Sequence, residues 1–300
     1  MNKGIYIWNL AVWDKDRKIA TEYSTPEELA SELTTGGFSH VLLKITDGIV
    51  YHNRLPNQVD YAANYIPVLR NAGIDVWGWG YAYGYLPAVE ASVAIDRCKM
   101  LGITNFVIDA EGQYKDRNSQ ATSYMIALRK GLPNVKFTLS TFRYPTYHME
   151  FPFKEFAEYC DYMMPQVYWE ESTDSAAQLV RSMNEYKEFG VPLIGATGAA
   201  YRTSKWLPTA TQIKQFYEEA KLLGLEMVNY WEWQCAKTIG LWQTLMALGG
   251  NTEPDTPTGQ DANPDDNNPD YMTEDAIREL VRYEIGVTLD KIADTLKSAL

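Results

Sequence analysis

Residues 75–111 read "DVWGWGYAYGYLPAVEASVAIDRCKMLGITNFVIDAE", and this stretch alternates between two kinds of pattern. Its two ends, 75–83 and 105–111, are short runs of apolar, β-branched and aromatic residues, which are typical of buried strands. The segment between them, 87–102, begins with a proline and ends with a glycine, as helices commonly do. The stretch therefore predicts one strand–helix–strand unit of a parallel sheet.

The same unit recurs along the chain at a spacing of roughly thirty residues. Strand candidates lie at 4–9, 40–46, 75–83, 105–111, 136–142, 162–169, 192–197 and 226–233. Helix-like segments lie at 25–37, 59–73, 87–102, 119–131, 152–160, 175–190, 208–224 and 238–250. Strict alternation of eight strands with eight helices predicts an α/β fold of the (β/α)₈ TIM-type barrel class. The alternative, a doubly wound open sheet, usually has a Gly-rich turn after its first strand, and "IWNLAVWDKD" has none.

The composition changes sharply near the C-terminus. Residues 250–270 hold six carboxylates, four prolines and no basic residue, so we expect a flexible acidic linker over 250–271. Residues 272–300 follow, with Thr273 as a helix cap and an apolar stripe at helical spacing. The stripe consists of Ile277, Val281, Ile285, Leu289, Ile292 and Leu296. We predict a catalytic barrel over 1–249 and a separate amphipathic helix, which either docks on the barrel or forms a homo-oligomer with other copies.

The net charge of −12 is unevenly spread. Residues 250–270 contribute −6 and residues 271–300 contribute −2, which leaves −4 for residues 1–249. No cluster of Lys and Arg is visible that could displace counterions from phosphate, so no nucleic-acid partner is expected. The sequence has no apolar run of about 18 residues, so no membrane insertion is expected either.

Several motifs of other enzyme classes are missing. The three histidines, His40, His52 and His148, have no ligand spacing, which argues against a zinc site. A G-x-S-x-G elbow, a Walker A sequence and a dinucleotide fingerprint are absent, so no cofactor is expected. Three widely separated cysteines fit free thiols in a reducing compartment, and "MNKGIYIWNL" does not resemble a signal peptide.

Two carboxylates stand where the fourth predicted strand ends, at Asp109 and Glu111. A TIM-type barrel carries its chemistry at this end of its strands. Residues two apart on a strand point the same way, so both side chains should enter the barrel mouth together. Their repulsion raises the proton affinity of one of them, which gives a proton donor beside a charged stabiliser, as cleavage of a glycosidic bond requires. The structural alternative is a pair that caps the next helix or binds a loop arginine such as Arg117.

The third predicted strand has one aromatic face, because Trp77, Trp79, Tyr81, Tyr83 and Tyr85 occupy alternate positions. Aromatic rings stack on the apolar face of a sugar. Core packing against helices explains the first two or three of these residues better, and the residues nearest the strand end, Tyr81 and Tyr83, are the candidates for substrate binding.

Polar side chains on two later strands are further candidates for substrate binding. Gln166 and Tyr168 share one face of the sixth strand and are costly to bury without partners, so they face either a ligand or a buried hydrogen-bond network. On the eighth strand, alternation lets either Glu232 or the pair Trp231 and Trp233 point inward, and the sequence leaves this open.

Two motifs resemble a known family. "LKITDG" (43–48) resembles the K-x-[ST]-[ED]-G strand end of glycoside hydrolase family 25 lysozymes, and "IDAEG" (108–112) resembles that family's D-x-E strand end. Members of the family are barrels that cut peptidoglycan. The resemblance implies that Glu111 is the proton donor with Asp109 beside it, and that Lys44 and Asp47 line the substrate site. In place of the aspartate that the family offers on its first strand, this sequence has Tyr6.

The sixth strand resembles a second family. "MPQVYW" (164–169) is similar to the M-x-Y pattern of chitinase-like barrels, glycoside hydrolase family 18. Those enzymes also carry an acid at the end of strand four, and they use the acetamido group of the substrate as nucleophile. This mechanism needs one protein acid with a stabilising Asp and Tyr, and Glu111, Asp109 and Tyr168 fit it.

The acid pair and the two resemblances together imply a retaining glycosidase that cleaves a β-linked N-acetylhexosamine polymer, with either a protein nucleophile or a substrate-assisted mechanism. Peptidoglycan is the expected substrate, and a lysozyme-like phage or prophage lysin is the expected type of enzyme. Such a protein would reach the cell wall after holin-type release, after lysis or as part of a phage particle. The alternative is a non-catalytic carbohydrate-binding or structural barrel of a phage particle or lysis assembly. The missing first-strand aspartate favours this alternative, and the D-x-E pair favours the enzyme.

Overall fold

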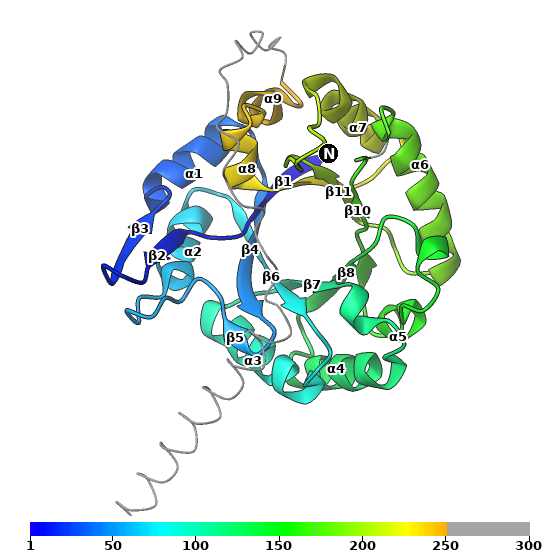
Figure 1. The fold of residues 1–300 in the computed structure, drawn as a ribbon, viewed down its shortest axis with the longest axis horizontal. Helices are drawn as coiled ribbons and strands as arrows, with labels where there is room; N and C mark the ends of the chain where they lie inside the picture. Colours follow the sequence, from blue (N-terminus) through cyan, green and yellow to red (C-terminus); the bar gives the residue numbers. More distant parts are fainter. Residues whose placement is uncertain (171, 251–300) are drawn as a thin grey trace, which may run out of the picture. The chain divides into compact units, whose positions relative to one another are not determined.

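Parallel strands close into a ring in the computed structural model, which describes residues 1–170 and 172–250. Helices surround the ring on its outer side (Figure 1). The ring strands are β1 (Asn2–Ile7), β4 (His40–Asp47), β6 (Asp75–Ala82), β7 (Asn105–Ala110), β8 (Lys136–Ser140), the pair β9 (Tyr162–Met163) and β10 (Gln166–Val167), β11 (Gly195–Ala199) and β12 (Met227–Trp231). The last of these, β12, pairs with β1, so the predicted (β/α)₈ barrel is confirmed.

The sixth ring strand is the least regular one, because Pro165 has no backbone N–H to donate and separates β9 from β10. Hydrogen bonds still join this strand to both neighbours. Met164 and Gln166 donate to the carbonyls of Leu139 and Thr141, each at 2.9 Å, and Thr197 donates to the carbonyl of Pro165 at 3.0 Å. The ring therefore closes across the proline.

The helices follow the strands in the predicted alternation. Their bounds are α1 (Pro26–Thr35), α2 (Tyr61–Asn71), α3 (Pro87–Leu101), α4 (Asn118–Gly131), α5 (Phe153–Ala157), α6 (Ser175–Tyr186), α7 (Ala210–Leu222), α8 (Trp233–Thr238) and α9 (Trp242–Ala247). The predicted start of α1 is confirmed, since Thr25 and Glu28 form a reciprocal capping box ahead of Pro26. Among the described residues, no helix combines the length and apolar character that a bilayer span requires.

The sequence missed a hairpin, a short strand and the helix α8, and it misplaced several strand ends. A hairpin of β2 (Ala11–Asp14) and β3 (Ile19–Glu22) follows the first ring strand, and β5 (Val50–Tyr51) folds back on β4. The eighth ring strand ends at Trp231, two residues before the predicted end. Glu232 caps the next helix there, because its carboxylate accepts the N–H groups of Cys235 (2.6 Å) and Gln234 (3.2 Å).

Two hydrophobic layers lie on opposite sides of the strands. Tyr6, Leu42 and Trp77 stand side by side in the register of β1, β4 and β6, and they belong to a cluster that fills the inside of the ring. Their strand neighbours, such as Val41, face the other way and pack against helix residues such as Leu69. Trp77 and Trp79 are core residues, with only 6% and 1% of their surfaces exposed, but they pack inside the ring and not against the helices as expected.

The described residues belong to one compact unit. The predicted acidic linker and C-terminal helix lie, apart from Gly250, outside the described residues. Self-association through that helix stays a prediction.

One buried carboxylate fixes the loop that follows β6. Glu90 on α3 is 3% exposed, and its two oxygens accept the backbone N–H groups of Tyr83 (2.8 Å), Gly84 (3.1 Å) and Leu86 (3.1 Å). Burial raises the pKa of Glu90, and the three N–H donors oppose that rise. Glu90 on α3 therefore anchors the loop that carries Tyr83 to the helix layer.

We expect Glu90→Ala to lower the free energy of unfolding by about 3 kcal/mol, because three donors lose their acceptor in a buried place. Urea denaturation would measure the loss. Asp96→Ala, which removes an exposed acid from the same helix, is the control and should change stability by less than about 0.5 kcal/mol. Equal effects of the two substitutions would contradict the anchoring role of Glu90.

Candidate active site

The acid pair stands at the C-terminal end of β7, where a TIM-type barrel carries its chemistry. Asp109 is 4% exposed and points into the ring, in register with Tyr81 on β6 and Ser140 on β8. Glu111 follows the last residue of β7 directly and is half-buried. The two carboxyls lie close enough for each to act on the pKa of the other. Both acidic side chains therefore enter the barrel mouth from the end of the same strand.

Gln166 on β10 holds the pair from the other side of the ring. Its amide nitrogen donates to Oδ1 of Asp109 at 2.9 Å, and the amide also lowers the pKa of Glu111. The polar face predicted for the sixth strand thus meets the acids. A neutral donor adds no positive charge that would force both acids to ionise.

Burial is the main cause that raises the pKa of both acids. The negative charge of Glu111 raises the pKa of Asp109 further, whereas the ammonium of Lys44 and the amide of Gln166 lower it. The amide of Gln166 and the neighbouring Asp109 lower the pKa of Glu111, and both oppose the effect of burial. Together the two carboxyls hold one proton more readily than two exposed acids would.

The loop arginine that could have explained the pair structurally does not contact it. Arg117 donates to the carbonyl of Gly84 at 3.1 Å and stacks over the ring of Tyr85, 4.6 Å from its centroid. Within the described ranges, no ion pair joins an arginine or lysine to Asp109 or Glu111. Glu111 stands at the cap position of the short 3₁₀ helix η1 (Gly112–Tyr114), but its side chain makes no capping hydrogen bond there, and α4 begins with Arg117 at its cap position.

A second polar cluster lies at the ends of β4 and β6. Lys44 is 1% exposed, and its ammonium lies 3.2 Å from Oδ2 of Asp47. The hydroxyl of Tyr83 donates to Oδ1 of the same carboxylate at 2.9 Å. The rings of Trp8 and Trp79 flank the ammonium, with centroids 4.8 and 4.9 Å away. This cluster keeps a cation close enough to lower the pKa of Asp109.

Tyr81 and Tyr83 expose less ring surface than a sugar needs for stacking. Each is 3% exposed, and their rings contact each other with centroids 4.7 Å apart. The hydroxyl of Tyr81 donates to Gln113 in the loop that follows Glu111. Their placement beside the acids agrees with the sequence, but their role in binding stays a prediction.

The three candidates on the eighth strand separate in the structure. Trp231 points into the mouth, where its ring contacts Tyr6, Trp8 and Trp79 at centroid distances of 5.2–5.5 Å. Glu232 caps α8, and Trp233 is 1% exposed within the layer between strands and helices. Neither arrangement allowed by simple alternation occurs, because the strand has already ended at Trp231.

Two aromatic residues close the mouth beyond the acids. The rings of Tyr168 and Tyr201 meet edge to face, with centroids 5.2 Å apart. The hydroxyl of Tyr201 donates to Glu170, and the negative charge of Glu111 contributes to a raised pKa of Tyr201. The sequence analysis did not find Tyr201, because it ended the seventh strand at residue 197 and β11 runs to Ala199.

Tyr6 occupies the inward position where the family 25 resemblance expects an aspartate. It is 3% exposed and lies beside the hydroxyls of Ser140 and Thr197. Burial raises its pKa, and the charge of Asp109 adds to this rise. A neutral phenol therefore stands below the acid pair in place of a third carboxylate.

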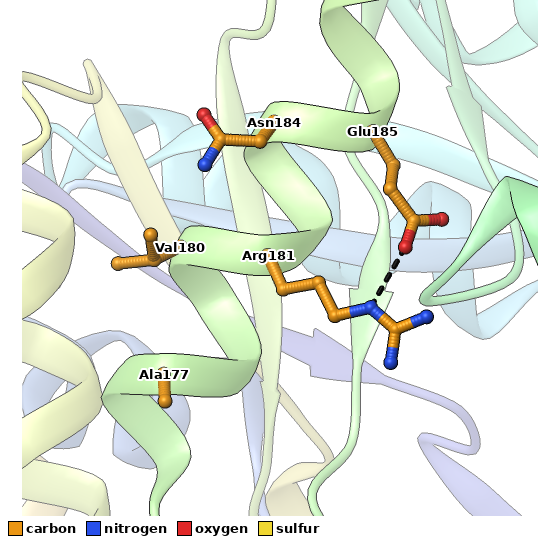
Figure 2. Close-up of a pocket in the computed structure, with 5 residues that line it drawn as sticks. All are labelled: Ala177, Val180, Arg181, Asn184 and Glu185. Atoms are coloured by element: carbon orange, nitrogen blue, oxygen red, sulfur yellow. Dashed lines mark hydrogen bonds and ion pairs between the residues drawn. The ribbon is translucent and has the colours of Figure 1, made fainter.

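A surface hollow elsewhere on the barrel does not mark the site. Its lining residues all belong to α6, and Figure 2 shows Arg181 directed toward Glu185. The lining consists of Ala177, Val180, Arg181, Asn184 and Glu185. The distance from Arg181 Nε to Glu185 Oε1 is 2.8 Å, so these charges already neutralise each other.

The barrel resembles solved glycosidase structures. The chitinase catalytic domain of Pyrococcus furiosus aligns with a TM-score of 0.57 and 14% identity, over 77% of this chain and 83% of that one. A family 18 N-acetylglucosaminidase from Paenibacillus barengoltzii gives 0.53 and 12%, over 82% and 98%. The spore cortex-lytic enzyme SleL from Bacillus cereus gives 0.53 and 9%, over 81% and 73%.

These identities establish the fold alone. No protein-family model matches the sequence, and no curated protein matches it. The chemistry of this chain is therefore argued from its own residues.

Proposed function

We propose that this protein is a glycoside hydrolase that cleaves a β-linked N-acetylhexosamine polymer, above all peptidoglycan. The observation that carries the proposal is the Asp109–Glu111 pair at the C-terminal end of a barrel strand. Burial raises the pKa of both acids, and Gln166 donates a hydrogen bond to Asp109. The three similar structures support it, because their names describe enzymes that act on chitin, on N-acetylglucosaminides and on spore cortex.

The closeness of the two acids favours a substrate-assisted mechanism. Inverting enzymes separate their two carboxyls by roughly 6.5–9.5 Å to admit a water, and retaining enzymes with a protein nucleophile separate theirs by roughly 5–5.5 Å. Two acids this near in the chain, each acting on the pKa of the other, fit a closer arrangement than either spacing. Glu111 would give its proton to the leaving oxygen as the C1–O bond breaks, while the acetamido oxygen of the substrate bonds to C1. Asp109 and Tyr168 would stabilise the charged ring that forms, and water would then open it with Glu111 as base.

Purified cell wall and chitin oligomers are the substrates that test this function. We expect dye release from labelled wall and shorter products from the oligomers, with retention of the anomeric configuration. A barrel that binds these glycans without cleaving them would instead support the alternative of a carbohydrate-binding or structural barrel, which the phenol of Tyr6 in place of an aspartate favours. Action as a phage lysin and the route to the wall remain predictions from the sequence.

A further inference from the structure

One guanidinium at the barrel mouth, that of Arg143, has no anionic partner among the described residues. Arg143 lies three residues beyond the end of β8 and is half-buried. One of its terminal nitrogens donates to the backbone carbonyl of Tyr168, and its guanidinium carbon lies 4.6 Å from the ring centroid of Tyr144. No carboxylate of residues 1–170 or 172–250 lies within 4.0 Å of it.

Two other arginines that have lost solvent contact are neutralised, whereas Arg117, which is also half-buried, bonds to a backbone carbonyl and stacks on a tyrosine. Arg97 bonds to Asp60 at 2.5 and 2.7 Å, and Arg129 bonds to Asp161 at 2.9 Å. Removing a cation from water is costly when no anion replaces the water, so an unpaired half-buried guanidinium needs a reason. A guanidinium carries five N–H donors in a fixed plane, and the carbonyl of Tyr168 uses one of those on Arg143. The others can bind a planar carboxylate at two points.

The guanidinium and the acids share one mouth. Arg143 bonds to Tyr168, which stands two residues after Gln166, and Gln166 bonds to Asp109 at 2.9 Å. The ring of Tyr168 contacts that of Tyr201. The hydroxyl of Tyr201 is in turn close enough to Arg143 and to Glu111 for both charges to act on its pKa, in opposite directions. A sugar bound at Glu111 would therefore lie near the guanidinium.

We propose that Arg143 binds a carboxylate carried by a sugar next to the bond that is cleaved. The substrate class is then a glycan whose sugars carry free carboxylates, such as peptidoglycan strands whose lactyl groups carry no stem peptide, and not the neutral polymer chitin. The proposal rests on the proposed function and deepens it. It assigns selection between two N-acetylated glycans to one side chain.

The experiment compares three tetrasaccharides of equal length. The first alternates N-acetylglucosamine with N-acetylmuramic acid and has free carboxylates, the second is the same molecule with its carboxylates amidated, and the third is chitotetraose. Arg143→Gln should lower kcat/KM for the first by about tenfold to a hundredfold and leave the other two unchanged, because a charged hydrogen bond contributes that much. Arg143→Lys should recover part of the loss, since it keeps the charge but not the planar donors.

Arg117→Gln is the matched control. Arg117 also stacks on a tyrosine and donates to a backbone carbonyl, but it lies on the loop before α4 and contacts neither Tyr168 nor Gln166. It should leave all three rates unchanged. Equal losses of Arg143→Gln on all three substrates would show a structural role for Arg143, and no loss on any would show that it binds no carboxylate; either result overturns the proposal.

The role of Arg143 can be tested even if the proposed hydrolase function is wrong. A wild-type protein that cleaves none of the three glycans would refute the hydrolase, and calorimetric binding of the same glycans would then test Arg143 alone. Tighter binding of the free-carboxylate glycan than of the amidated one, lost in Arg143→Gln, would support the subsite. Equal binding of these two glycans to the wild-type protein would overturn it.

Discussion

Replacing Glu111 with glutamine is expected to lower the rate of glycan hydrolysis by about 10²- to 10⁴-fold while glycan binding persists. Glutamine keeps the shape of the side chain, but it has no proton to transfer. The loss should therefore appear in kcat and not in KM. Dye release from labelled wall measures the rate, and calorimetry with an unlabelled oligosaccharide measures binding.

Glu150→Gln is the control for this substitution. Glu150 lies on the neighbouring loop after β8, is exposed, and pairs with Lys115 at 3.8 Å, so it is an acid near the mouth but outside the pair. It should keep full activity. If Glu111→Gln turned over substrate at a near-normal rate, Glu111 would not be the proton donor, and a non-catalytic barrel would become the better interpretation.

The position of the acid pair was predictable because two strong local rules agree on it. A buried apolar strand must end where polar residues begin, and side chains two apart on a strand point the same way. Asp109 and Glu111 satisfy both rules, and the alternation of strands and helices fixed which end of the strand forms the barrel mouth. Gln166 followed from the cost of burying an amide without a partner.

The rest of the site depends on where strands stop and on contacts between loops. Glu232 lies outside the strand because its carboxylate accepts two N–H groups at the start of α8. The alternation of apolar and polar residues in a strand does not show that a residue can cap a helix instead. Tyr201 and Arg143 lie on loops after β11 and β8, where no period applies. Both residues belong to the site because they contact Tyr168 across the mouth. Tyr168 is distant from both in the sequence, so no local pattern reveals these contacts.

Asp109→Asn is expected to separate activity from stability. Asparagine keeps the shape of the side chain and an oxygen for Gln166, so the fold should be retained. It carries no charge to stabilise a cationic intermediate, and we expect kcat to fall by about 10²-fold or more, at least as much as in Tyr168→Phe. Equal rates for Asp109→Asn and the wild-type protein on cell wall would remove the substrate-assisted mechanism.

The same substitution should raise stability at neutral and alkaline pH. Burial and the charge of Glu111 hold the pKa of Asp109 well above its ordinary value of 3.8 in the folded protein. Between that value and the folded pKa the folded state binds more protons than the unfolded state, so the free energy of unfolding of the wild-type protein falls as pH rises. Asparagine has no such proton, and a difference of one in pKa corresponds to about 1.4 kcal/mol.

Urea denaturation at pH 4 and at pH 8 would therefore show similar stabilities at the lower pH, and Asp109→Asn more stable by about 1 kcal/mol or more at the higher pH. Asp161→Asn provides the opposite case. Hydrogen bonds from Lys136, Phe137 and Arg129 outweigh burial and lower the pKa of Asp161, so its contribution to stability is present above its ordinary pKa and is lost as pH falls. A catalytic acid is expected to lower the stability of the folded protein at the pH at which the enzyme works, whereas a structural acid is not. If Asp109→Asn destabilised the protein at pH 8 as Asp161→Asn should, Asp109 would be a structural residue, and the pair would lose its claim to catalysis.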